Sequence, residues 1–479
     1  MLQRLIRNTL WRSLADVVAR LGSALFWILL ARFLGAGIFG ALSFALALMG
    51  FFELVSSLGL GSILTRDAAQ DPAAAGRYFG HLLIIGMASA VVGAMGMVAA
   101  AWAIRPDPAT LSIVIVLALL LPLSSISYWS RAMLAAAEKM QYISFGTLVE
   151  NGLLILLGLG WLLTGRGLTA VVTALVVSKL AASVLLFTLA RSQAARPVWR
   201  IERGMLRTIL CQVPLFLTIA VCNGLFWSVT VVMITWLQGE VAAGYFSAAY
   251  KLISYALLFA VAFSQALFPV AARLAQQNRA LYLALLRRAL YYLLMLFLGV
   301  ALTLSLLARP IILLLYGPGM AGAIPVLRAL AWMAVPYGLI PALAYTLVSH
   351  HYQRRDMWAN LAGALAVIAG NLALVPGWSA AGGALAMVAG ACVFAGIEFG
   401  SVCTLLYPLK PGRSLRRLGA SAGALALTLV LLREAPLVLS LSLGCGIYAL
   451  ALWLSRAIDH QDLIQLWRSA LPLREEGLA

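Results

Sequence analysis

Residues 168–190, LTAVVTALVVSKLAASVLLFTLA, form an apolar stretch broken only by Lys179, and residues 191–207, RSQAARPVWRIERGMLR, follow it with five Arg and a single acidic residue. A helix needs about 20 apolar residues to cross the hydrocarbon core of a bilayer. Arginine directly after such a stretch keeps the connection on the cytoplasmic side. These two segments therefore predict a membrane-spanning helix that ends in the cytoplasm, and the rest of the chain repeats the pattern.

Apolar stretches of this kind occur about fourteen times along the chain. They cover residues 14–35, 38–63, 80–103, 110–134, 142–164, 168–190, 208–237, 244–270, 289–308, 324–349, 358–376, 381–407, 418–432 and 435–455. The composition agrees, with 63% hydrophobic residues, 10% charged residues and a mean hydropathy of +0.99. Such values exclude a water-soluble domain of this length and predict an all-α, polytopic membrane protein.

Positive charge lies on every second connection between these stretches. Of the 34 Lys and Arg residues, most lie at the N-terminus or on the even-numbered connections. The opposite connections carry only Arg105, Arg166, Arg309 and Arg433. This asymmetry predicts that both termini are cytoplasmic. The net charge of +18 is then explained by loops next to anionic lipid, so we expect no nucleic-acid partner.

The arginine-rich connection after the sixth stretch suggests two halves. Gly40-Ala-Leu-Ser-Phe-Ala opens the second stretch, and Gly244-Tyr-Phe-Ser-Ala-Ala opens the eighth in the same way. We interpret this as a parallel repeat of two six-helix bundles, a plan that in transporters places a site between the halves. The predicted divisions are an N-terminal lobe of residues 1–190, a basic cytoplasmic linker of residues 191–207, a C-terminal lobe of residues 208–407, and an extra hairpin with a cytoplasmic tail in residues 408–479.

Five ionisable residues lie deep in the apolar stretches, where a charge costs about 2.5 to 3.5 kcal/mol. They are the cations Arg20, Lys179 and Lys251 and the carboxylates Glu53 and Glu398. They are either ion pairs within the bundles or the lining of a polar cavity. A shared cavity with three cations would favour an anionic solute, because phosphate matches Arg and Lys donors well.

Depth along the helices also predicts a pair. Arg20 and Glu53 lie at similar depths from the cytoplasmic ends of adjacent predicted helices, so their side chains could meet.

Motifs of enzymes and cofactor sites are missing from the sequence. The segment Gly317-Pro-Gly-Met-Ala-Gly322 has the spacing of a dinucleotide loop, but it contains Pro, lies on a predicted outer connection and has no acidic residue soon after it. No G-K-[ST] phosphate loop is present, and the five Cys and four His show no metal-ligand spacing. We therefore expect no catalytic residue, no cofactor and no metal.

Several segments resemble the polysaccharide exporters and O-antigen flippases of the Wzx type. The most specific is Ala31-Arg-Phe-Leu-Gly-Ala-Gly-Ile-Phe-Gly40, which looks like the A-R-x-L-G-x-x-x-F/Y-G signature at the first turn of those proteins. Further similar segments are Gly59 to Arg66, Gly244 to Leu252, Leu267 to Arg273, Leu315 to Gly319 and Val326 to Arg328. The resemblance covers roughly residues 14–407.

This resemblance implies the fold of the multidrug/oligosaccharidyl-lipid/polysaccharide (MOP) exporters, in which two six-helix lobes surround a cationic central cavity. It implies a flippase that moves undecaprenyl-pyrophosphate-linked oligosaccharide across the bacterial inner membrane for surface polysaccharide and O-antigen synthesis. It also implies alternating access and transport coupled to an ion gradient. Arg20, Lys179 and Lys251 would then contact the pyrophosphate or acidic sugars, and Glu53 or Glu398 would serve in coupling or gating. Membrane lipid and a polysaccharide polymerase are the implied partners.

Three alternatives remain from the sequence. A multidrug exporter shares the fold but usually has twelve spans. A lipid II flippase has fourteen but typically shows Asp-Ala-Phe where this chain has Gly40-Ala-Leu. A membrane-embedded glycan polymerase or ligase should carry a large outer loop with catalytic Arg or acidic residues, and the predicted outer loops are short. The identity of the glycan and the coupling ion are not encoded in any recognisable motif.

Overall fold

The computed structural model describes residues 2–104, 107–164, 167–200, 202–350, 352–406 and 414–455. The side chains of residues 2–21 lie outside the described part. Within these ranges the chain is helical almost throughout and forms no strand, which confirms the predicted all-α class. Ten helices in the described ranges are long and apolar enough to cross a membrane.

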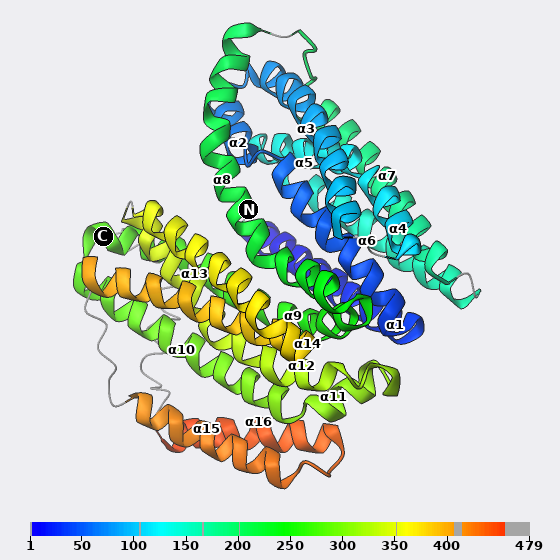
Figure 1. Cartoon of the computed structure of the whole chain (residues 1–479). Coiled ribbons are helices and arrows are strands. Elements are labelled where there is room, and N and C mark those ends of the chain that lie inside the picture. Colours follow the sequence, from blue (N-terminus) through cyan, green and yellow to red (C-terminus); the bar gives the residue numbers. More distant parts are fainter. Residues whose placement is uncertain are drawn as a thin grey trace. The chain divides into compact units, whose positions relative to one another are not determined.

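The chain forms two compact units (Figure 1). Unit 1 comprises residues 1–248 and 371–380, and unit 2 comprises residues 249–370 and 381–479. Unit 1 contains α1 (Leu2–Ser56), α2 (Gly61–Gln70), α3 (Ala75–Ile104), α4 (Pro108–Ala118), α5 (Leu121–Ala136), α6 (Met140–Leu163), α7 (Gly167–Gln193), α8 (Arg203–Gln238) and the start of α9 (Glu240–Gln277). The predicted division at residues 190 and 207 stays a prediction.

Unit 2 holds the remainder of α9 and the helices that follow it. These are α10 (Arg279–Leu306), α11 (Ala308–Leu315), α12 (Ala323–Leu330), α13 (Ala334–Ser349), most of α14 (Gln353–Leu405), α15 (Ser414–Leu431) and α16 (Leu437–Leu454). Two short 3-10 turns, Pro318–Met320 and Ala331–Met333, flank α12. Within the described residues every predicted apolar stretch lies mostly on helix, although residues 38–63, 110–134, 289–308 and 324–349 are each divided between successive helices.

Two of the long helices contain a sharp turn that the apolar pattern places only approximately. In α1 the turn is at Gly35, whose positive φ of 73° suits a residue without a side chain. Figure 1 shows the second half of α1, in lighter blue, running back beside the first. In α14 the turn is at Ser379, with φ of 48°. Each of these helices therefore supplies two of the predicted crossings.

The tip of α14 belongs to unit 1 because residues 371–380 pack on α8 there. The amide of Asn371 donates to the hydroxyl of Thr230 at 3.1 Å, and both side chains are fully buried. The amide of Gln238 donates to the carbonyl of Pro376 at 3.4 Å. Hydrogen bonds between polar side chains of different helices help to hold helices together where no water competes for them.

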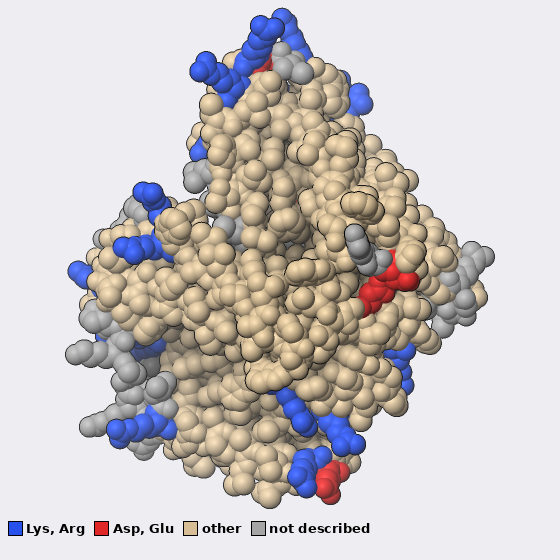
Figure 2. Space-filling view, in the orientation of Figure 1, with Lys and Arg blue, Asp and Glu red and all other residues tan. Residues whose placement is uncertain are grey.

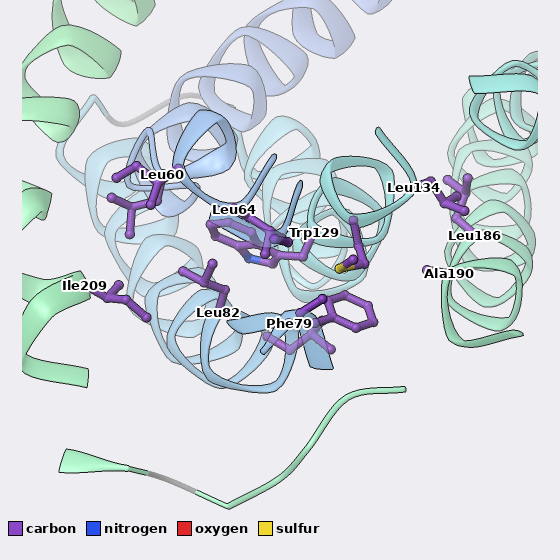
Figure 3. Packing of buried hydrophobic residues seen from close by; sticks show 14 residues of the cluster. Leu60, Leu64, Phe79, Leu82, Trp129, Leu134, Leu186, Ala190 and Ile209 are labelled. Atoms are coloured by element: carbon purple, nitrogen blue, oxygen red, sulfur yellow. The ribbon is translucent and has the colours of Figure 1, made fainter. Parts of the chain in front are cut away.

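A cluster of large buried side chains fixes one end of unit 1 (Figure 3). It draws on α2, α3, α5, α7 and α8, and its labelled members are Leu60, Leu64, Phe79, Leu82, Trp129, Leu134, Leu186, Ala190 and Ile209. Trp129 fits against α3 because Gly86 carries no side chain, and a Cβ there would overlap the indole ring. Small residues of this kind let helices approach closely in a membrane, where dispersion contacts supply much of the attraction.

The basic segment 191–200 lies along the start of α3. Gly76 and Gly80 face it, and a Cβ at Gly80 would overlap the backbone carbonyl of Val198. The amide of Val198 donates to the carbonyl of Gly76 at 2.9 Å. The segment that was predicted as a linker is thus held by backbone contacts within unit 1.

His81 adds a second attachment for this segment, one that depends on its neutral form. The amide N–H of Glu202 donates to Nε2 of His81 at 2.8 Å, so Nε2 must be the acceptor. The proton therefore lies on Nδ1, which donates to the carbonyl of Arg77 at 2.8 Å. With both ring nitrogens engaged and the side chain buried, His81 is a structural residue and not a metal ligand.

Charged side chains surround broad uncharged surfaces in the space-filling view. Figure 2 shows Lys and Arg gathered at the end of unit 1 that includes the basic segment. Exposed arginines of this region are Arg66, Arg77, Arg196, Arg200, Arg203 and Arg207. This separation of apolar and cationic surface is typical of a membrane-spanning protein with basic loops.

The two short repeats pack against each other in unit 1. A Cβ on Gly40 would overlap the carbonyl of Glu240, and a Cβ on Gly244 would overlap the carbonyl of Ala36. Glu240 lies four residues before Gly244, and Ala36 lies four residues before Gly40. Each glycine therefore meets the equivalent residue of the other segment. The contact is therefore reciprocal, as two related segments around a two-fold axis would make it.

In unit 2, α10 is the helix on which its neighbours pack. It contacts α11, α12, α13, α15 and α16. The α15–α16 hairpin is attached through Tyr448, whose hydroxyl donates to the carbonyl of Met295 at 2.8 Å and whose ring lies against Gly299. Leu418 and Leu452 are buried beside it. The extra hairpin therefore belongs to the packed structure of unit 2.

We expect Gly40→Ala to destabilise unit 1 by about 2 kcal/mol, because the new methyl group meets backbone and cannot be accommodated by a side-chain rotation. Thermal unfolding of the purified protein in detergent measures the effect. Gly50→Ala in the same helix is the matched control, since a Cβ at Gly50 meets nothing within 4 Å. Equal stability of the two variants would show that the reciprocal contact does not exist.

His81→Phe should release the segment around Glu202, because it removes two hydrogen bonds of about 0.5 to 1.5 kcal/mol each while keeping the ring volume. Limited trypsin digestion should then cleave faster after Arg200 and Arg203. Cleavage after the exposed Arg66 in the same digest is the internal control and should be unchanged. An unchanged rate after Arg200 and Arg203 would contradict the attachment through His81.

Candidate functional site

A chain of alternating charges crosses four helices of unit 1. The ammonium of Lys179 on α7 lies 3.2 Å from Oε1 of Glu53 on α1 and 3.3 Å from Oε1 of Glu150 on α6. The other carboxylate oxygen of Glu150 accepts from the guanidinium of Arg131 on α5 at 2.7 Å. Arg131 also donates to the hydroxyl of Thr147 at 2.9 Å. Two cations and two carboxylates thus form one network.

The network compensates its own charge and remains partly open. The side chain of Lys179 is 20% exposed and that of Glu53 is 36% exposed. Full burial would make breaking such a pair very costly, whereas partial exposure leaves room for an exchange of partners. By the expected topology, Arg131 lies near the cytoplasmic end, and Lys179 and Glu53 lie deeper in the membrane. In that expected topology the network would lead from the cytoplasmic side toward the middle of unit 1.

A small polar pocket adjoins this network at Glu53. Its walls are Glu53, Ser56, Ser57, Leu121, Ser124, Ser125 and Tyr128, and its volume of about 10 Å³ is close to the space of one water molecule. The hydroxyls of Ser124 and Ser125 are buried and have no protein partner. Buried hydroxyls of this kind are usually satisfied by ordered water. The carboxylate of Glu53 thus lies between a lysine and a water-sized polar pocket.

The predicted site residues fall into three environments. Lys179 and Glu53, which were predicted as a substrate cation and a coupling carboxylate, form one ion pair. Lys251 lies half-buried on α9 in unit 2. Glu398 is fully buried on the second half of α14, also in unit 2. The side chain of Arg20 lies outside the described residues, so its suggested pairing with Glu53 stays a prediction.

Arg131 and Glu150 were not among the predicted site residues. Both lie near the predicted cytoplasmic ends of their stretches, where ionisable residues are common. A signal was available, because these two residues lie at similar predicted depths on consecutive stretches. The structure shows that this pair extends the charge network that begins at Lys179.

We expect Glu150→Gln to destabilise the protein by about 1 to 2 kcal/mol, and by more than Glu53→Gln. Glu150 accepts from both Arg131 and Lys179, so its loss leaves two cations without this shared carboxylate, whereas loss of Glu53 leaves Lys179 paired with Glu150. Thermal unfolding of the two single variants in detergent makes the comparison. A larger effect of Glu53→Gln would contradict the bridging role of Glu150.

Comparison with known proteins identifies the family of the chain and its fold. The model of a family described as "Polysaccharide biosynthesis protein" matches residues 5–275, which is more than half of the chain. A comparison with curated proteins gives no match.

Solved structures with the same fold are transporters. The chain is similar to the lipid II flippase MurJ in an inward closed conformation, with a TM-score of 0.76 and 14% identity over 95% of this chain and 100% of that chain. It is also similar to an inward-facing multidrug resistance MATE family transporter of the MOP superfamily, with a TM-score of 0.68 and 16% identity over 80% of this chain and 92% of that chain. For a MOP superfamily transporter from Pyrococcus furiosus the TM-score is 0.56 and the identity 16%, over 81% of this chain and 91% of that chain. At these identities the similarity shows the fold alone.

Proposed function

Since the chain belongs to the polysaccharide biosynthesis protein family and has the fold of MOP superfamily transporters, we propose that it is a flippase for lipid-linked oligosaccharide. Its substrate is an undecaprenyl-pyrophosphate-linked oligosaccharide, which it moves from the inner to the outer leaflet of the bacterial cytoplasmic membrane. The product serves surface polysaccharide or O-antigen synthesis, and a polysaccharide polymerase would use it there. Both termini lie in the cytoplasm in this proposal.

The observation that carries the proposal is the partly open charge network at Lys179, within a chain of this family. A pyrophosphate is a dianionic group that lysine and arginine bind through charge-assisted hydrogen bonds. Its transfer through hydrocarbon is prohibitive unless the protein supplies such donors along the way. Lys179 already has two carboxylate partners, so a pyrophosphate can take their place without leaving the ammonium unpaired.

This exchange suggests how substrate binding leads to movement. When the ammonium of Lys179 turns to the pyrophosphate, Glu53 and Glu150 lose a shared cation that joins α1, α6 and α7. The equilibrium between conformations then shifts by the difference in these interactions. Arg20 and Lys251 are proposed as further contacts for the anionic groups of the substrate, and Glu53 or Glu398 as the carboxylates that couple transport to an ion gradient.

We expect Lys179→Ala to reduce transfer by about tenfold or more, since a charge-assisted hydrogen bond contributes about 1.5 to 3 kcal/mol. Proteoliposomes with the full chain and an undecaprenyl-pyrophosphate oligosaccharide measure the transfer, read as accessibility of the glycan on each leaflet. Lys139→Ala, in a short connection outside the network, is the matched control and should leave transfer intact.

Two results would contradict the proposal. Transfer that is equal in Lys179→Ala and in the intact chain would remove Lys179 from the substrate path. Absence of transfer of several such oligosaccharides, with movement of lipid II or of a cationic drug instead, would favour the activities that the structurally similar MurJ and MATE proteins are named for.

A further inference from the structure

The two halves of α14 fold back on each other in unit 2 with a defined register. A Cβ on Gly363 would lie 2.9 Å from Cβ of Phe394, and a Cβ on Gly370 would lie 2.9 Å from Cβ of Ala386. These contacts place residues before the turn at Ser379 opposite residues that follow it by a similar distance. The absence of side chains at both glycines lets the two segments pack closely over this length.

The same register brings two acidic residues together. Asp356 lies about two helical turns before Gly363, and Glu398 lies about one turn after Phe394, so the hairpin brings the two residues to nearly the same level. The carboxyl group of Asp356 lies within hydrogen-bonding reach of the carboxyl group of Glu398, and two negative charges there would repel each other. Asp356 is half-buried, close to the start of α14, whereas the side chain of Glu398 is 0% exposed.

Glu398 lacks the partners that a buried carboxylate requires. Neither of its two side-chain oxygens has a hydrogen-bond donor from the protein within the described residues. Leaving a buried carboxylate without a donor or counter-ion costs several kcal/mol, and a second negative charge beside it adds repulsion. A carboxyl group can satisfy its neighbour only when one of the two holds a proton, because an ionised carboxylate is an acceptor alone.

Neighbouring helices do not supply a counter-ion in the described part of unit 2. Val402 of α14 packs against α10 and α13. The titratable groups there have other hydrogen-bond partners. The hydroxyl of Tyr282 donates to Thr346, the ring of His350 contacts the carbonyl of Thr346, and the guanidinium of Arg279 donates to the carbonyl of Leu406. None of these three groups forms a hydrogen bond or an electrostatic interaction with Glu398.

The chemistry of the pair favours a proton over a metal cation. Within the described residues there is no cluster of three or more His, Cys, Asp or Glu side chains that could hold a metal ion. Two carboxyl groups are a small ligand set, since hard metal cations take about six to eight oxygens. A single proton needs only the two oxygens that face each other.

We propose that Asp356 and Glu398 form a proton-binding site in which the two carboxyl groups share one proton. The inference deepens the proposed function, on which it rests, because this proton is then the ion that couples transport to the gradient. Asp356 is the more exposed member and exchanges the proton with the aqueous phase. Glu398 holds it within the α14 hairpin. Opening of the hairpin separates the two groups and releases the proton.

Proton binding can be measured without any substrate. Difference infrared spectra of the purified full chain, recorded across a pH series, should contain the carbonyl stretch of a protonated carboxylic acid. We expect Glu398→Gln to remove this band. Asp356→Asn should shift the frequency of the band without removing it, because the buried carboxyl of Glu398 then keeps its proton but has lost the carboxylate that accepts from it. Glu434→Gln is the matched control, because Glu434 lies on a connection of unit 2 with a side chain 86% exposed, and it should leave the band unchanged.

Coupling is tested in proteoliposomes with an imposed pH gradient. The intact chain should move undecaprenyl-pyrophosphate oligosaccharide faster with the gradient than without it, and an entrapped pH dye should report proton movement when substrate is added. Glu398→Gln and Asp356→Asn should both lose the acceleration and the proton movement, while Glu434→Gln keeps them. Folding of each variant is checked by thermal unfolding, and the two substitutions serve as independent tests of one site.

The outcomes separate the two proposals. A spectrum without a band that depends on Glu398 overturns the proton site, whether or not the oligosaccharide is moved. A band that sodium removes at constant pH also overturns it, because the site would then take a metal cation. A band that behaves as expected, together with no transfer of any oligosaccharide tested, leaves the proton site in place and overturns the proposed function.

Discussion

The structure depends on one constraint, that backbone amides and carbonyls in hydrocarbon must find their partners within the protein. Helices satisfy it, and nearly every described residue outside the short connections is helical. The same constraint governs the side chains that cannot be satisfied by their own helix. Charged groups in unit 1 are joined across four helices, and the buried Asn371 reaches Thr230 on α8.

Close approach of helices then supplies the remaining cohesion. Lipid is as apolar as leucine, so burying leucine gains little, and contacts depend on fit. Glycines provide this fit at Gly86 beneath Trp129, at Gly80 beneath the segment 191–200, and at Gly363 in the α14 hairpin. The polar sites lie among these tightly packed contacts, which position carboxylates and cations that solvent would otherwise separate.

Hydropathy and charge were sufficient to predict the helices, because length and flanking arginine decide which segments cross a membrane. The sequence also predicted how deep each residue lies in the membrane, and this identified Lys179, Glu53 and Glu398 as ionisable residues far from the ends of their helices. The sequence could not predict which face of a helix packs against which neighbour, because helices that are apolar on every side have no periodic pattern. For that reason the partner of Lys179 and the role of Arg131 emerged only from the structure, as did Asp356 beside Glu398.

The reciprocal packing of Gly40 and Gly244 has a bearing on how such a chain arose. Each glycine occupies the same place in its own segment and meets the equivalent carbonyl of the other. A contact of this form is what two identical subunits make across a two-fold axis. If the two segments derive from one, an ancestor of half the length would have met a second copy of itself through this surface, and gene fusion would turn that dimer interface into an internal contact.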